Sequence, residues 1–236
     1  MRNKINLLIS LYHIEDSERM AEIVFCLNKN LHNKYISTII ILNEGFHHPV
    51  LMNEKLKNIK VDSRPAYRDF LPFMEEHSIN IIANADIWYD STLGKLQSLR
   101  WHRKIVYLLC RREKDGQIIG VSGNAHDSWA FFGKPPALKL ANFYMGIPHC
   151  EQRLAAVMHD CGYFVLNPSK FISTWHEHKS EERAYYSTGE NYDGSCLVVK
   201  PANQFEIRLL YAIFWYLKKK KYFYRRFNEN GQVFDR

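Results

Sequence analysis

The chain has 236 residues, of which 46% are hydrophobic, so it can bury a sizeable core in one large domain or two small ones. Its five cysteines contain no C-x-x-C pair, which argues against a disulfide framework and a thiolate zinc site. A formal net charge of +7 favours anionic partners, a class that includes nucleic acid, a lipid surface and a phosphorylated small molecule.

The amino-terminal residues do not resemble a cleavable signal, because Met1 to Lys4 leads into a short apolar run with no small-residue cleavage site behind it. The longest candidate for a membrane span, Leu209 to Leu217, falls short of the roughly 20 apolar residues required and stops at four lysines. We therefore expect a cytoplasmic protein, with peripheral association at a membrane left open.

Apolar runs typical of buried strands alternate with helical patterns along the chain. In chain order the expected elements are a strand at Ile5 to Leu11, a helix at Glu15 to Leu31, strands at Ile36 to Leu42 and Asn58 to Val61, a helix at Tyr67 to His77, a strand at Ile79 to Ala83, a helix at Ser91 to Leu99, a strand at Ile105 to Cys110, a helix at Glu151 to Asp160, strands at Tyr163 to Leu166 and Phe171 to Trp175, and a helix at Ala202 to Lys221. This order predicts an α/β fold with a parallel, doubly wound sheet and a ligand beyond the carboxyl ends of the strands.

The strand that ends at Ala83 runs directly into Asn84-Ala85-Asp86. Asn84 and Asp86 are spaced i and i+2, so their side chains share a face. A hard cation such as Mg²⁺ or Mn²⁺ needs only one or two protein carboxylates when substrate phosphates complete its shell, which makes Asp86 a candidate metal ligand. The alternative is that both residues only cap the turn into the next helix.

A second group of polar residues follows later in the chain, where Glu151 begins a helix that ends before Gly162. The helix dipole should keep Glu151 ionised, which suits a general base, although a first-turn acid can also serve only its helix. Arg153 could orient Glu151, bind a diphosphate or remain a solvated helix charge. Of His176 and His178 farther on, we expect one to be a bystander.

Between these groups lies a polar loop that enters an aromatic strand. Asp127 in this loop could hydrogen-bond the hydroxyls of a sugar or act as the base, with Trp129 and Phe131 as apolar walls. An exposed loop acid without a role is the rival interpretation.

In this order of motifs the sequence resembles the inverting GT-A glycosyltransferases, over roughly three quarters of the chain. The resemblance implies a Rossmann-like GT-A fold in which Asp86 and His176 hold Mn²⁺ or Mg²⁺ on a nucleoside diphosphate sugar, with UDP as the usual nucleotide. It implies Glu151 as the general base, with Asp127 as the alternative. Asn84 stands where the family has its first aspartate, so it is expected to contact a ribose or a water.

By the same resemblance, further residues are expected to contact the donor. These are Ser10, Tyr12, Arg64, Tyr67, Arg68, Asn84, Ala85 and Arg153. The acceptor would be the hydroxyl of a glycan or glycolipid. The implied organisation is a catalytic domain over residues 1–186, divided into a nucleotide-binding half (1–90) and an acceptor and catalytic half (91–186), followed by a linker and a basic helical tail over 187–236.

The tail combines apolar residues at helical spacing with Lys218 to Lys221 and with Arg225 and Arg226. This pattern is typical of an interfacial helix on an anionic membrane, and equally of a final helix that packs on the domain and ends in solvated charge.

Two other classes of function compete with the transferase. A nucleic-acid-binding module is compatible with the basic charge and the aromatic residues, but the lysines cluster in the tail and no recognition motif is present, so no nucleic acid partner is expected. A nucleotidyltransferase or phosphohydrolase could use the same sheet and metal, although glycine loops that cradle phosphates are missing.

Overall fold

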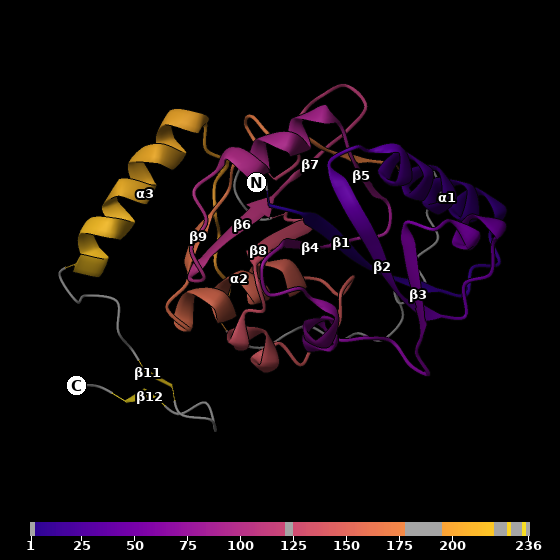
Figure 1. Cartoon of the computed structure of the whole chain (residues 1–236), viewed down its shortest axis with the longest axis horizontal. Helices are drawn as coiled ribbons and strands as arrows, with labels where there is room; N and C mark the ends of the chain where they lie inside the picture. Colours follow the sequence, from indigo (N-terminus) through magenta and orange to yellow (C-terminus); the bar gives the residue numbers. More distant parts are fainter. Residues whose placement is uncertain (1–2, 121–124, 178–194, 220–225, 228–232, 235–236) are drawn as a thin grey trace.

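The computed structural model describes residues 3–120, 125–177, 195–219, 226–227 and 233–234. A central sheet lies between two layers of helices (Figure 1). Apolar side chains from both faces of this sheet form two hydrophobic clusters, one under each helical layer. The polar residues of interest lie where the strands of this sheet end.

The central sheet has seven strands in the order β3-β2-β1-β4-β8-β6-β9. Their bounds are β1 Ile5–Tyr12, β2 Ile36–Glu44, β3 Leu56–Lys60, β4 Ile79–Ala83, β6 Ile105–Leu109, β8 Ser128–Phe132 and β9 Phe164–Leu166. Every neighbouring pair is parallel except the two that involve β8, which runs antiparallel to β4 and β6. The expected α/β fold with a mostly parallel central sheet is therefore confirmed.

Each face of the sheet carries its own set of helices, because the strands are apolar on both sides. One layer contains α1 (Ser17–His32), η3 (Ser91–Ser98) and α3 (Gln204–Lys219); the other contains η2 (Tyr67–Phe73), η4 (Pro136–Leu140) and α2 (Cys150–Asp160). The short η1 (Pro49–Met52) precedes β3.

Two segments expected as helices are 3₁₀ helices. The first, η2, ends at Phe73 instead of His77 and has Pro72 inside it, where proline cannot donate a backbone hydrogen bond. The second, η3, contains Gly94, at which a Cβ atom would lie 2.5 Å from the ring of Tyr35. A glycine is needed here because the backbone packs directly on that ring.

A second, smaller sheet has the strand order β5-β10-β7, with bounds Ile87–Tyr89, Thr174–His176 and Arg111–Arg112. The strands have two or three residues each, which is too short for a hydrophobic period to show in the sequence. The expected strand over Phe171 to Trp175 is thus shifted to Thr174–His176. This sheet joins three parts of the chain that are distant in sequence.

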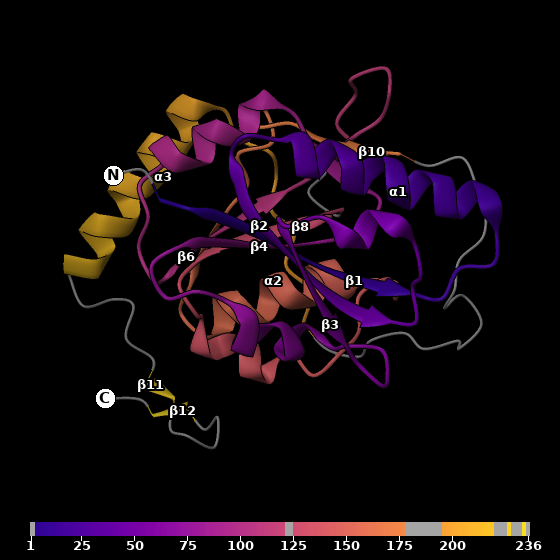
Figure 2. The ribbon, with the colours of Figure 1, turned by 45° about the vertical axis from the view of Figure 1, so that its right-hand side comes forward.

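The helix expected in the tail is present as α3 and lies beside β9 (Figures 1 and 2). It packs on the domain through Ile207, Tyr211 and Phe214, of which Phe214 stacks on Phe164 of β9 with 5.2 Å between ring centroids. Beyond it are the two short paired strands β11 (Arg226–Phe227) and β12 (Val233–Phe234). Among the residues that the structure describes, no helix combines the length and apolarity required to cross a bilayer.

Candidate active site at the carboxyl ends of the strands

Asp86 lies just beyond β4, in the turn that leads into β5, and its side chain is buried between Arg19 and His176. Its Oδ2 atom accepts a hydrogen bond from Arg19 Nη2 at 2.8 Å and lies 3.4 Å from His176 Nε2. His176 reaches this position because β10 pairs with β5, where His176 stands opposite Ile87. The small sheet therefore brings together the two residues that the sequence predicted as metal ligands.

Arg19 is the residue that compensates the charge of Asp86 from the other side. It is in the first turn of α1, where Asp16 caps the helix by accepting from the Arg19 backbone at 2.5 Å. Its guanidinium also binds Glu22 Oε2 at 2.9 Å and hydrogen-bonds Tyr12 at the end of β1. Because Glu22 balances Arg19, the group of Arg19, Glu22 and Asp86 retains one net negative charge.

The surroundings of Asp86 favour its ionised form. Burial alone would raise its pKa, but the hydrogen bond from His176 and the positive charge of Arg19 together hold that pKa below its usual range. The same contact acts on His176, whose pKa is raised by Asp86 against the effect of burial. Asp86 is therefore a carboxylate at neutral pH, as a metal ligand must be.

The other ring nitrogen of His176 faces a second carboxylate. His176 Nδ1 lies 3.4 Å from Glu113 Oε1, and Glu113 is in turn 3.3 Å from Arg111 Nε. A carboxylate on one imidazole nitrogen orients the other nitrogen toward a ligand, which is the usual outer-shell arrangement of metal-binding histidines. Glu113 is within ion-pair distance of His176 Nδ1, while His176 presents Nε2 to Asp86.

The Asp86 and His176 pair has the donor set for a hard cation, although it supplies few ligands. In the described part of the chain no group of three or more His, Cys, Asp or Glu is placed to hold a metal ion. Mg²⁺ and Mn²⁺ keep several waters and accept phosphate oxygens, so one carboxylate and one imidazole suffice when a diphosphate is bound. With the net negative charge beside Asp86, these residues fit a divalent metal.

A second acidic centre adjoins the first. Asp127, immediately before β8, is 2% exposed, so the interpretation as an exposed loop acid is wrong. Its Oδ1 atom accepts from Asn84 Nδ2 at 3.0 Å and from Arg111 Nη1 at 3.1 Å. Its Oδ2 atom is buried and has no hydrogen-bond partner within the described residues. A buried carboxylate oxygen of this kind is suited to accept from a ligand hydroxyl.

Glu151 opens α2 close enough to Asp127 for the two charges to interact. Burial first, and then the charge of Asp127, raise the pKa of Glu151 to about 7, while Arg111 acts in the opposite direction. Burial likewise raises the pKa of Asp127. The expectation that the helix dipole keeps Glu151 fully ionised is thus incomplete, because desolvation outweighs the dipole.

Of the residues expected to contact the donor, three lie in or directly after the strands β1 and β4 that lead into this site. Ser10 is half-buried in β1, Tyr12 binds Arg19, and Ala85 packs against the first hydrophobic cluster between Asn84 and Asp86. The side chain of Asn84 is engaged by Asp127, so a contact with ribose has to replace or share that hydrogen bond.

The other four lie elsewhere. Arg64 binds the carbonyl of Met145 and stacks on Tyr144, in the loop before α2. Arg68 is exposed beside Asp69, and Arg153 hydrogen-bonds the carbonyl of Ser195. Tyr67 is fully buried, packs on Trp129 and Phe143, and donates to Cys150 Sγ at 3.5 Å. Tyr67 is a core residue, so the expected nucleotide contact has no exposed surface on which to form. His178 is outside the described residues.

Three charged residues of the site were missed from the sequence: Arg19, Arg111 and Glu113. A signal existed for Arg111, because it directly follows a buried strand and so must emerge near the same edge as Asp86. Arg19 and Glu22, spaced i and i+3, look like an ordinary surface pair on a helix. Nothing in the sequence pattern showed that this pair faces inward.

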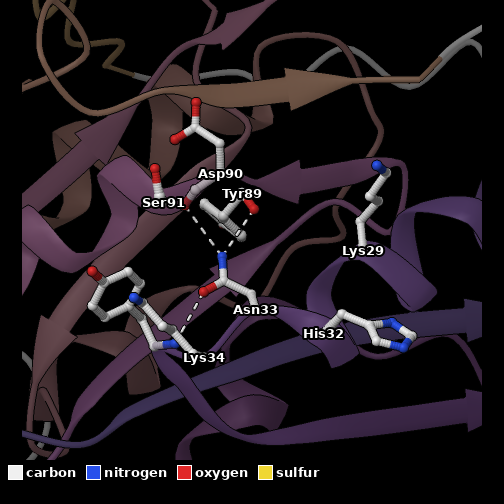
Figure 3. Close-up of a pocket in the computed structure, with 8 residues that line it drawn as sticks. Lys29, His32, Asn33, Lys34, Tyr89, Asp90 and Ser91 are labelled. Atoms are coloured by element: carbon white, nitrogen blue, oxygen red, sulfur yellow. Dashed lines mark hydrogen bonds between the residues drawn. The ribbon is translucent and has the colours of Figure 1, made fainter.

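A shallow pocket of about 290 Å³ lies apart from the site, at the carboxyl-terminal end of α1 (Figure 3). Asn33 in this pocket donates to the carbonyls of Tyr89 and Asp90 and accepts from the backbone of Tyr35. Arg19 is at the opposite end of the same helix, roughly 20 Å away at 1.5 Å per residue. The polar groups in this pocket serve the turn, so we do not assign it to the chemistry.

No family model matches the sequence, and no curated protein matches it. Among solved structures, the chain is similar to GalNAc-T7, solved with UDP, GalNAc and Mn2+, with a TM-score of 0.49 and 11% identity over 95% of this chain and 51% of that one. The chain thus spans about half the length of GalNAc-T7. It is also similar to the glycosyltransferase GlyE of Streptococcus pneumoniae TIGR4, with a TM-score of 0.46 and 12% identity over 93% of this chain and 64% of that one.

A third similar structure is 4-diphosphocytidyl-2C-methyl-D-erythritol synthase from Anaerococcus prevotii DSM 20548, with a TM-score of 0.45 and 12% identity over 90% of this chain and 96% of that one. Glycosyltransferases, the class that the motifs resemble, are therefore among the similar structures. Because these TM-scores lie below 0.5, the assignment of a reaction depends on the residues of this chain alone.

Replacing Arg19 with methionine should destabilise the fold, because it removes the guanidinium that contacts the buried carboxylates of both Asp86 and Glu22. We expect the free energy of unfolding in urea to fall by about 3–5 kcal/mol. Arg68→Met is the matched control, because Arg68 is exposed and its ion pair with Asp69 is long, at 3.7 Å. Its effect on the free energy of unfolding should stay within about 0.5 kcal/mol. Equal effects of the two substitutions would contradict the compensation of Asp86 by Arg19.

Proposed function

We propose that this protein is a metal-dependent glycosyltransferase that moves a sugar from a nucleoside diphosphate sugar to a hydroxyl of a glycan or glycolipid. The observation that supports this most directly is the placement of two acidic centres side by side. Asp86 with His176 forms one centre, and Asp127 with Glu151 and Arg111 forms the other. The first centre suits a metal and a diphosphate, and the second suits a sugar and its acceptor.

The first centre would bind the leaving group. A Mn²⁺ or Mg²⁺ ion held by Asp86 and His176 would neutralise charge that develops on the departing diphosphate. Arg19 donates a hydrogen bond to the Asp86 carboxylate, and Glu113 lies within ion-pair distance of His176 on the other side of its ring. Both ligands would therefore be held in place before the donor arrives, which reduces the reorganisation needed during the reaction.

The second centre would handle the sugar and the proton. The unpartnered Oδ2 atom of Asp127 would accept from a hydroxyl of the donor sugar, while Asn84 and Arg111 hold the other oxygen. Glu151, with a pKa of about 7, would remove the proton from the attacking hydroxyl, because a base works best when its pKa lies near the operating pH. Direct displacement by that hydroxyl would invert the anomeric carbon. We propose UDP as the nucleotide.

Nucleotide and metal should stabilise the protein only together. We expect the midpoint of thermal unfolding to rise with UDP plus Mn²⁺, and with neither alone, because the metal links the diphosphate to Asp86. GDP and dTDP in the same assay show which base is preferred. Asp86→Ala should abolish the shift, whereas the exposed Asp62→Ala should preserve it.

Stabilisation by RNA and by no nucleotide would overturn the transferase in favour of a nucleic-acid-binding module. A shift with nucleotide that persists in Asp86→Ala would show that the metal is held elsewhere.

The pH dependence of turnover should report the ionisation of Glu151. At saturating metal and substrates the rate should rise with pH and level off above about pH 7, because only the ionised carboxylate can accept the proton. Asp127→Asn removes the neighbouring charge that raises this pKa, so its rising limb should move to lower pH even if its maximal rate falls.

The corresponding substitution of the general base is Glu151→Gln. This variant should bind nucleotide and metal normally and lose about 10²- to 10⁴-fold in turnover. Unchanged turnover in Glu151→Gln would transfer the role of base to Asp127.

A further inference from the structure

Arg111 lies between the two acidic centres and connects them through its side chain. Its Nη1 atom donates to Asp127 Oδ1 at 3.1 Å, and its Nε atom donates to Glu113 Oε1 at 3.3 Å. The same oxygen of Glu113 is 3.4 Å from His176 Nδ1. One guanidinium therefore links Asp127 in the second centre, by way of Glu113, with His176 in the first.

The backbone around β7 brings both ends of this connection together. Arg111 and Glu113 are two residues apart in an extended segment, so their side chains share a face. Because β7 pairs in parallel with β10, Glu113 comes to the level of His176. On the other side, the backbone of Asp127 donates to the carbonyl of Leu109 at 3.0 Å, two residues before Arg111. One continuous segment thus reaches both centres.

A short hairpin holds this segment in place. The carbonyl of Arg111 accepts from the backbone of Ile119 at 2.9 Å, and the backbone of Glu113 donates to the carbonyl of Gln117 at 3.1 Å. Gly116 in the turn has a φ of +83°, a left-handed conformation that favours glycine. The side chains of Arg111 and Glu113 therefore start from a defined backbone, and they are only 30% and 37% exposed.

The two contacts of Arg111 require the shape of an arginine. A guanidinium presents several donors in a fixed planar fork, and here two different nitrogens serve two different carboxylates. A lysine carries the same charge, but it concentrates all its donors on one nitrogen. Arg111→Lys is therefore expected to keep the charge near Asp127 and to lose the simultaneous contact with Glu113.

The charge of Arg111 also acts on Glu151, the base in the proposed reaction. Burial first, and then the charge of Asp127, raise the pKa of Glu151, whereas Arg111 lowers it. The other titratable groups that interact with Glu151 are Cys150 and Tyr67, whose own pKa values are raised by burial, so both are neutral at pH 7. Arg111 is thus the cation that opposes Asp127 at this base.

We propose that Arg111 is a positioning residue shared by both centres, which holds Asp127 for the sugar and, through Glu113, holds His176 for the metal. This role rests on the proposed function and assigns Arg111 no contact with the donor or the acceptor. A single side chain would keep the metal ligand and the sugar-binding carboxylate in a fixed relative placement, which reduces reorganisation when the donor binds.

A titration of the full chain without metal or nucleotide tests the link to the second centre. Carbon NMR of protein labelled at the glutamate side-chain carboxyls measures the pKa of Glu151, whose signal is identified by its loss in Glu151→Gln. Arg111→Gln should raise this pKa by about 0.5 or more, because it removes the cation that lowers it. Asp127→Asn should move the same pKa in the opposite direction.

The matched control is Arg112→Gln. Arg112 is the next residue of β7 and is also half-buried, but its guanidinium donates to the carbonyls of Gly116 and Ser169, at 2.9 and 2.8 Å. Its replacement should leave the pKa of Glu151 unchanged, even if it lowers the thermal unfolding midpoint as much as Arg111→Gln does.

Binding of UDP at saturating Mn²⁺, measured by calorimetry, tests the link to the first centre. Arg111→Lys should leave the pKa of Glu151 close to the parent value and weaken this binding about tenfold, because Glu113 is no longer held beside His176. Replacing the carboxylate partner of a metal-binding histidine typically costs about 10- to 100-fold in affinity, so Glu113→Gln should weaken binding similarly. Arg112→Lys should bind as the parent does.

Equal effects of Arg111→Gln and Arg112→Gln on the pKa of Glu151 would overturn the shared role of Arg111. Parent-like binding of UDP with Mn²⁺ by Arg111→Lys would overturn it as well, and this variant decides the matter if Arg111→Gln does not fold. A parent protein that binds no nucleotide in the presence of metal would contradict the proposed function instead, and the titration of Glu151 would then decide alone whether Arg111 acts on the second centre.

Discussion

Asp86 is a carboxylate buried at the end of a parallel strand, and the compensation of its charge determines how the candidate site is assembled. An uncompensated carboxylate at this position would be costly, so the fold surrounds it with Arg19 from α1 and His176 from β10. Each contact joins an element outside the central sheet to the turn that follows β4. Glu22 in turn balances the charge of Arg19, and Glu113 lies within ion-pair distance of His176.

The pKa values of the two aspartates at this edge, Asp86 and Asp127, are shifted in opposite directions, although each aspartate is paired with an arginine. Asp86 has a lowered pKa, because His176 and Arg19 outweigh burial, while Asp127 has a raised pKa, because burial outweighs Arg111. Environments that separate the pKa values of neighbouring acids are how proteins assign them different roles. The contrast supports Asp86 as a fixed anion for a metal and the pair of Asp127 and Glu151 for hydroxyl and proton chemistry.

The sequence was sufficient for the central sheet, because long apolar strands and amphipathic helices have clear periods. It was also sufficient for the positions of Asp86 and Glu151, because they stand directly at the ends of such elements. It was insufficient for the small sheet, whose strands are too short to show a period, so the proximity of His176 to Asp86 was expected only from the family resemblance. Arg19 was missed because an i, i+3 pair with Glu22 is typical of a solvated helix face. Tyr67 was placed at the nucleotide because its position in the chain says nothing about the direction of its ring.

We propose that Asp86 and His176 together hold a divalent metal at the donor diphosphate. The most direct measurement is a crystal structure with UDP and Mn²⁺, in which anomalous scattering locates the manganese. We expect the manganese signal next to both the Asp86 carboxylate and His176 Nε2, in contact with the diphosphate, with Arg19 still bound to Asp86. A diphosphate bound without manganese, or a manganese signal away from Asp86, would rule out a metal held by Asp86 and His176.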